Sequence, residues 1–192
     1  MEPELREAEY RNALELLRRE RFEQAAEIFK RLSASHIGAR AYYGWLLERG
    51  LGCTKDSSQA GELYRSAAEE GSSIAQFFLG SMYWRQRNGT ECVKWFERAA
   101  AQGDAPADYC LNRIYRTGKV VTRNKEKARF HLGRAAARGH LYALRDVQYY
   151  SLLGEYGSLA LLRAPFLVLP ALLRVMRALV RTPNDPRVAR HA

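Results

Sequence analysis

Apolar side chains recur at helical spacing along most of the chain, and short polar or glycine-rich breaks separate the apolar series. Residues 4–32 carry two such series on either side of the charged run at 18–21, a pattern that predicts two antiparallel helices. Three later stretches repeat this plan of paired apolar series, at residues 35–71, 72–103 and 104–139. The pattern therefore predicts an all-α chain built from helical hairpins.

One short phrase closes each of the three later stretches: two alanines, then two further residues, then a glycine. The glycines are Gly71, Gly103 and Gly139, which lie 32 and 36 residues apart. This spacing is typical of a helical-hairpin repeat. Small residues facing aromatic ones across each hairpin let the two helices approach closely. The middle copy is shorter because its loop at 85–90 lacks the Gly-x-Gly turn found at 50–52.

The order of these residues carries a family resemblance. The order runs Ala, Leu-Gly, Tyr, Gly-x-Gly, Asp or Asn, Ala, an aromatic residue and Ala-Ala-x-x-Gly. This order is similar to that of the Sel-one-like (Sel1) repeat, a relative of the tetratricopeptide repeat. The match covers residues 35–139 and is best in the first copy, where Gly50, Gly52 and Asp56 all fit. The resemblance implies a right-handed α/α superhelical solenoid, and an adaptor scaffold with no chemistry of its own.

These patterns divide the chain into seven segments. The predicted segments are a tetratricopeptide-like hairpin at 1–34, repeat 1 at 35–71, repeat 2 at 72–103, repeat 3 at 104–139, a partial repeat 4 at 140–157, a basic amphipathic and apolar helical segment at 158–181, and a disordered polar tail at 182–192.

The segment 158–181 admits three interpretations. Its uninterrupted apolar run covers only ten residues, 164–173, against the ~20 needed to span a bilayer. At about 100° per residue its arginines fall on one narrow face, which predicts a basic amphipathic helix lying on an anionic membrane. The residues expected to contact the membrane are Arg163, Phe166, Leu167, Leu172, Leu173, Arg174, Arg177 and Arg181. The two other interpretations are that the segment caps the repeat array, or that it forms a spanning or re-entrant hairpin. Pro165 and Pro170 constrain the helix in all three interpretations, because a proline fits a first turn but kinks or restarts a helix elsewhere.

The charge of the chain favours acidic partners. Lys and Arg number 31 against 21 Asp and Glu, a net charge of +10. We therefore expect a protein or acidic peptide as partner, together with an anionic membrane surface. The charged start of the chain lacks the order of a secretory signal, so we expect a cytoplasmic protein, peripheral on the cytoplasmic face of a membrane.

No pattern in the chain indicates an enzyme. Metal-binding HExxH spacing, phosphate-binding glycine loops and Gly-x-Ser-x-Gly are all absent from the sequence, so we expect no catalytic residue, metal, cofactor or small-molecule substrate. His131 stands where Trp95 stands in the preceding unit, which favours a packing role. Cys92 and Cys110 occupy positions of small buried residues, which favours inert thiols.

The resemblance implies that the first helix of each hairpin lines a concave groove. The groove-facing residues expected on this basis are Trp45, Glu48, Arg49, Phe77, Trp84, Arg85, Tyr109, Arg113, Arg116, Arg145 and Tyr149. Alternating aromatic residues and arginines suit an acidic peptide. The alternatives are that these aromatics pack between repeats while the arginines are a solvated face, or that the basic surface binds nucleic acid.

Overall fold

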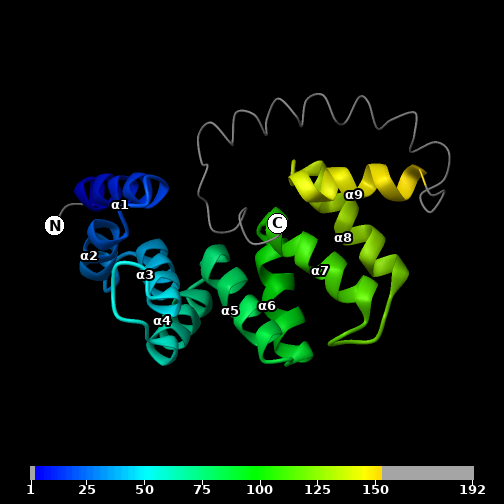
Figure 1. The fold of residues 1–192 in the computed structure, drawn as a ribbon, viewed down its shortest axis with the longest axis horizontal. Helices are drawn as coiled ribbons and strands as arrows, with labels where there is room; N and C mark the ends of the chain where they lie inside the picture. The colour runs from blue at the N-terminus through cyan, green and yellow to red at the C-terminus, as the bar shows by residue number, and fades with distance from the viewer. Residues whose placement is uncertain (1–2, 153–192) are drawn as a thin grey trace. The chain divides into compact units, whose positions relative to one another are not determined.

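A computed structural model describes residues 3–152 of the protein (Figure 1). Within this range every regular element is an α-helix, which confirms the predicted all-α class. The helices are α1 (Pro3–Arg18), α2 (Phe22–Leu32), α3 (Ile37–Arg49), α4 (Ser57–Glu69), α5 (Ser73–Arg85), α6 (Gly89–Ala101), α7 (Ala105–Thr117), α8 (Lys125–Ala137) and α9 (Leu141–Leu152). None of these helices is both long and apolar enough to cross a bilayer. The segment 158–181 and the tail 182–192 lie outside the described residues, so their helix and tail stay predictions.

The helices form two compact units, residues 1–99 and 100–192, and we describe each by itself. In the first unit α1 packs against α2, α3 against α4, and α3 also contacts both α2 and α5. In the second unit α8 packs against α7 on one side and α9 on the other. Each unit therefore consists of antiparallel hairpins whose helices are neighbours both in sequence and in space.

The first helix of each later hairpin begins at a residue whose side chain caps it. The side chain of this N-cap accepts a hydrogen bond from the backbone N–H three residues later, which satisfies one of the free amides of the first turn. The four N-caps are His36, Ser72, Asp104 and His140, with acceptor distances of 3.0, 3.3, 2.9 and 3.3 Å. Two histidines thus have a backbone-capping role that the sequence analysis did not assign.

Glycine and an aromatic ring interlock in two of the hairpins. A Cβ placed on Gly44 would lie 3.0 Å from the Tyr64 ring, and one on Gly80 would lie 2.9 Å from the Phe96 ring. Tyr64 and Phe96 are fully buried. The small residue therefore lets the ring of the second helix rest on the backbone of the first, as the pairing of small and aromatic positions predicts.

The glycines of the repeated phrase end the second helices. Gly71, Gly103 and Gly139 have φ of +100°, +93° and +82°, in the left-handed region that side chains with a Cβ rarely adopt. Nothing lies within 4 Å of a Cβ placed on any of them. Backbone conformation rather than lack of space therefore selects glycine at these three positions.

Gly52, in the loop between α3 and α4, is constrained by both conformation and space. Its φ is +68°, and a Cβ there would lie 2.3 Å from the backbone carbonyl carbon of Phe22 at the start of α2. The loop of one hairpin thus rests directly on the backbone of the preceding hairpin.

Gly52→Ala should lower the free energy of unfolding by about 2–4 kcal/mol, because alanine meets both the unfavourable φ and backbone atoms that cannot move aside cheaply. Urea denaturation followed by circular dichroism would measure the change.

Gly133→Ala is the matched control, since Gly133 lies inside α8 and nothing is within 4 Å of its Cβ position. This change should raise the free energy of unfolding by up to about 1 kcal/mol through helix propensity. A Gly52→Ala protein as stable as the parent would contradict the assigned packing of the loop.

Candidate functional site

In the first unit, the first helices α3 and α5 are joined by an ion pair between side chains at their C-terminal ends. Arg85 of α5 pairs with Glu48 of α3, and the hydroxyl of Tyr64 donates to the same carboxylate at 3.1 Å. The guanidinium of Arg49 lies over the ring of Trp45, 5.0 Å from its centroid. Arg49 and Arg85 are exposed, so both reach solvent.

Two of the predicted groove residues of the first unit lie in its core instead. Trp45 is 5% exposed and Phe77 is 1% exposed, and the ring of Phe77 packs on Phe78 and Phe96. Trp45 is buried because α3 contacts three other helices, so nearly its whole circumference is covered. Phe77 lies on α5, which contacts both α3 and α4. Trp84 is intermediate, with its ring edge-on to Phe96 at 6.4 Å. The expected surface of this unit is thus reduced to its two arginines and parts of Glu48 and Trp84.

In the second unit, α7 and α9 are linked by a buried hydrogen bond. The hydroxyl of Tyr109 donates to the carboxylate of Asp146 at 3.0 Å, and Arg145 donates to the other oxygen of that carboxylate at 2.9 Å. Burial and the neighbouring Asp146 raise the pKa of Tyr109 to about 12, although Arg113 and Arg145 act in the opposite direction. Tyr109 is 5% exposed, so it is a core residue rather than a groove residue.

Four predicted residues of the second unit remain at or near the surface, and we call them the α7–α9 surface: Arg113, Arg116, Arg145 and Tyr149. Tyr149 is 57% exposed, while Arg116 and Arg145 are exposed and Arg113 is half-buried. Arg116 lies over the ring of Tyr150 at 5.7 Å, and Arg145 lies over the ring of Tyr142 at 5.2 Å. Arginines from two first helices are therefore held on aromatic rings within one unit.

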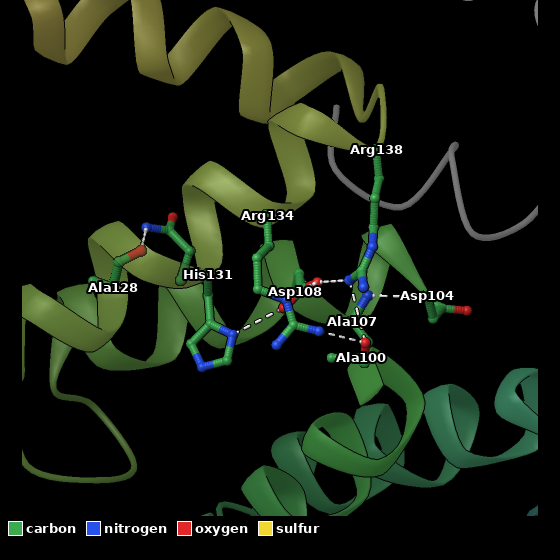
Figure 2. A network of polar contacts seen from close by, with 9 residues as sticks. Ala100, Asp104, Ala107, Asp108, Ala128, His131, Arg134 and Arg138 are labelled. Atoms are coloured by element: carbon green, nitrogen blue, oxygen red, sulfur yellow. Dashed lines mark hydrogen bonds and ion pairs between the residues drawn. The ribbon is translucent and has the colours of Figure 1, made fainter. Parts of the chain in front are cut away.

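A buried carboxylate that sequence reasoning missed lies near the start of α7. The side chain of Asp108 is 0% exposed, and three side chains of α8 and its C-cap converge on it (Figure 2). His131 Nδ1 is 2.9 Å from one oxygen, and Arg134 Nε is 3.4 Å from the other, which Arg138 also contacts. Because a carboxylate oxygen only accepts hydrogen bonds, His131 Nδ1 carries the proton of its bond.

The same arginines also bind the end of α6. Arg134 and Arg138 donate to the carbonyl oxygen of Ala100 at 2.6 and 3.2 Å. Carbonyls in the last turn of a helix have no partner within the helix. The backbone N–H of Gly103 donates to the Ala100 carbonyl at 3.1 Å, and the two arginines add side-chain bonds to it. We call Asp108, His131, Arg134, Arg138 and the Ala100 carbonyl the Asp108 cluster (Figure 2).

The other hairpins carry different chemistry at the position of Asp108, four residues after the N-cap. In the second repeat Gln76 donates to the Ala68 carbonyl at 3.1 Å. In the first repeat Arg40 pairs with Glu70, which stands where Arg138 stands in the third repeat. The ion pair is therefore reversed in sign between the two copies. A comparison of the three phased positions, all polar, is the signal that could have revealed Asp108.

His131 has the predicted packing role and a polar role as well. It is buried, and its ring stacks on Tyr115 with centroids 5.8 Å apart. Its bond to Asp108 is the part that comparison with Trp95 could not predict. Among residues 3–152 no group of His, Cys, Asp and Glu is arranged to hold a metal ion.

The predicted burial of two cysteines is confirmed. Cys92 is fully buried and Cys110 is 1% exposed. Burial raises the pKa of Cys92 to about 12, which keeps this thiol in its unreactive protonated form. Burial also raises the pKa of the partly exposed Cys53.

Capped first helices, glycine-ended second helices and interlocked small and aromatic residues define a helical-hairpin repeat protein. A model of the Sel1 repeat family matches residues 38–72, 73–104 and 107–140, more than half of the chain. The chain belongs to the Sel1 repeat family, which confirms the resemblance. Proteins with these repeats are generally scaffolds that bind other proteins, and their fold is typically non-catalytic.

Two solved structures share the fold. A Sel1 repeat protein from Oxalobacter formigenes is 29% identical, with a TM-score of 0.64 over 74% of this chain and 59% of that one. A protective antigen present in uropathogenic Escherichia coli strains, which displays the SLR fold, is 26% identical, with a TM-score of 0.61 over 69% of this chain and 30% of that one.

Two curated relatives are chitin synthase regulators named SKT5. The protein from Saccharomyces cerevisiae is 34% identical over 119 residues, which are 55% of this chain and 17% of the relative. The protein from Malassezia restricta is 30% identical over 122 residues, which are 60% of this chain and 8% of the relative. The chain thus spans less than a fifth of the length of either regulator.

Asp108→Ala should lower the free energy of unfolding by about 3–5 kcal/mol, because it leaves two arginines and a histidine around an empty, partly buried position. Asp108→Gln should cost less than half as much, since a glutamine can donate to the Ala100 carbonyl as Gln76 does to Ala68. Urea denaturation would measure both changes.

Glu70→Ala is the control for this cluster, because it removes the corresponding ion pair of the first repeat, in which the glutamate is 45% exposed. Its cost should be at most about 1 kcal/mol. Equal losses from Asp108→Ala and Glu70→Ala would show that the burial of the cluster contributes nothing extra.

Proposed function

We propose that this chain is a non-catalytic adaptor that binds an acidic segment of another protein through the α7–α9 surface. The observation that carries the proposal is the pairing of exposed arginines with aromatic rings on two neighbouring first helices. Arg116 lies on Tyr150 and Arg145 on Tyr142, and the exposed Tyr149 stands beside them in sequence. Arginine and tyrosine are among the residues most enriched at the energetic centres of protein interfaces.

The geometry of these arginines favours binding of carboxylates. A guanidinium held over a ring has lost part of its side-chain freedom before binding, so less entropy is lost when a partner arrives. The N–H groups of a guanidinium lie in its own plane, where a carboxylate can accept two of them. Arg145 already directs two of its donors to Asp146, so this geometric argument applies to Arg116. The net charge of +10 adds long-range attraction for an acidic partner.

The first unit supports the same role with fewer residues. Arg49 lies over Trp45, and the exposed Arg85 is held by Glu48. The relatives are named as regulators of chitin synthase, and they match 60% and 55% of this chain. Binding to a larger protein assembly through the repeats is the role we propose for this chain by analogy.

The double variant Arg113→Glu/Arg145→Glu should reduce recovery of the partner by at least about tenfold, because two reversed charges face an acidic segment. Affinity purification with quantitative mass spectrometry would measure recovery, and circular dichroism would verify that helical content is unchanged.

The matched control is Lys94→Glu/Arg98→Glu, which makes the same charge change at two exposed positions of α6. Recovery with this control should stay within twofold of the parent. Equal recovery with both double variants would remove the α7–α9 surface from the proposal.

We propose in addition that residues 158–181 attach the chain to an anionic membrane surface. The support is the sequence pattern alone, with four arginines on one face and apolar residues opposite. Near such a surface each arginine contributes about 1 kcal/mol. The cytoplasmic face is the surface we propose, because that leaflet carries the anionic lipids.

The full chain should therefore sediment with vesicles containing phosphatidylserine, and a chain ending at Gly157 should stay in the supernatant. Binding of the full chain should weaken as salt is raised, since the arginine contribution is electrostatic. Vesicles of phosphatidylcholine alone are the control. Equal sedimentation of the two chains would rule out the segment as the attachment site.

A further inference from the structure

The second unit contains a cavity of about 260 Å³ on the side of α7 that faces α9 and the start of α8. We call it the basic pocket. Its polar lining consists of Asn112, Arg116, Arg123, Lys125, Arg129 and Tyr150. Four of these side chains are cationic and none is acidic. The volume lies below the range of about 300–1,000 Å³ typical of cofactor and drug sites, so the pocket suits a side chain rather than a whole cofactor.

Asn112 stands where the other two repeats have the interlocking glycine. Gly44 and Gly80 each lie against an aromatic ring, Tyr64 or Phe96, that leaves no room for a side chain. In the third repeat the position of that ring holds Leu132. The smaller residue on α8 therefore leaves space for the asparagine on α7, and a polar side chain replaces a packing contact.

The orientation of Asn112 is set by the backbone of α8. Its amide nitrogen donates to the carbonyl of Ala128 at 2.8 Å, which fixes the orientation of the side-chain amide, and Asn112 lines the pocket. The side-chain oxygen of Asn112 is buried, in a residue that is only 1% exposed, yet it has no hydrogen-bond partner in the described part of the chain. A buried acceptor without a donor is costly, so the site is built to accept an N–H or O–H from a ligand.

The charge of the lining adds a second requirement. Four cationic side chains around one small cavity repel one another, and an anion relieves that repulsion. Arg116 is held over the ring of Tyr150, which fixes one of the charges at the wall. The ligand must therefore combine negative charge with a hydrogen-bond donor in a small volume.

We propose that the basic pocket binds an acidic residue of a partner peptide. The side-chain carboxylate pairs with the arginines, and a peptide N–H donates to the Asn112 oxygen. Fully ionised phosphate and the phosphodiester backbone of nucleic acid carry charge but no donor. The chain's own residues 153–192 are a poor complement, because they contain six arginines and only two acidic residues. The inference rests on the proposed adaptor function and specifies the chemistry of its ligand.

Fluorescence anisotropy with the full chain would test the pocket. The probe is a fluorescein-labelled peptide of alternating glycine and glutamate with blocked ends, and its control has glutamine in place of glutamate. The glutamate peptide should bind at least about tenfold more tightly than the glutamine peptide. Binding of both peptides with equal affinity would overturn the proposal.

Two variants locate the binding. Asn112→Ala and Arg123→Glu should each weaken binding of the glutamate peptide by about tenfold or more. Arg123 is exposed, so its variant tests the pocket even where Asn112→Ala disturbs the hairpin. The control Lys94→Glu/Arg98→Glu should change the affinity less than twofold. Unchanged affinity in both pocket variants, each with parental circular dichroism, would overturn the proposal.

Competition separates the peptide from other anions. Displacement of the peptide by inorganic phosphate, with no effect of Asn112→Ala, would overturn the proposal in favour of a simple anion site. Preferred binding of a uridine oligonucleotide that Arg123→Glu abolishes would overturn it in favour of nucleic acid. The outcome is independent of the adaptor test, because neither Arg113 nor Arg145 lines the pocket. If partner recovery is lost in the adaptor test while both pocket variants bind the glutamate peptide with the affinity of the parent, the adaptor proposal stands and the pocket proposal is overturned.

Discussion

A helix ends with carbonyl groups that have no partner in the helix, and in a stack of hairpins those groups are buried by the next first helix. In the three repeats, one of these carbonyls receives a side-chain hydrogen bond that involves the residue four positions after the N-cap of the next helix. These bonds add to backbone bonds such as those from Gly71 to Ala68 and from Gly103 to Ala100. In α9 the corresponding residue is Leu144, which has no polar side chain. Arg40 donates to the carbonyl of Ser33 at the end of α2, and Gln76 donates to Ala68 at the end of α4. In the third repeat Asp108 cannot donate, so it holds two arginines that donate to Ala100 instead. The three repeats therefore share this contact, while the residue types that make it differ.

The variation has an energetic consequence within each unit. A neutral glutamine in the second repeat needs no counter-charge, whereas the buried carboxylate of the third repeat is tolerable only with its arginines and histidine in place. Asp108 and its partners are separated by up to 30 residues, so α7 and α8 must be docked before the charges neutralise each other. The third repeat thus couples its folding to electrostatics more strongly than the second does.

The sequence predicted the hairpins well because their signals are local. The phased glycines require a positive φ, and the apolar series require a helix with one buried side, both of which are properties of short segments. The faces of the first helices could not be predicted in the same way. Trp45 and Phe77 look like surface candidates on their own helices, and they are buried because each of these helices packs against at least two others. The Phe77 ring also contacts Phe96 of its own hairpin. Asp108 resembles a solvated residue until its partners on α8 are known. The sequence shows that Asn112 replaces the glycine of the Leu-Gly pair, but the space for its side chain depends on Leu132, twenty positions later.

The exchange of glycine and ring for asparagine and leucine shows how a repeat array can acquire individuality. The two positions compensate in volume, and α7 and α8 of the third repeat still pack against each other. The third repeat thus has a polar side chain where the first two repeats have the contact between a glycine and an aromatic ring. The glycine–ring pair therefore distinguishes the copies within this chain: the first two repeats keep the interlock, and the third has in its place a buried polar side chain whose oxygen lacks a hydrogen-bond partner among the described residues.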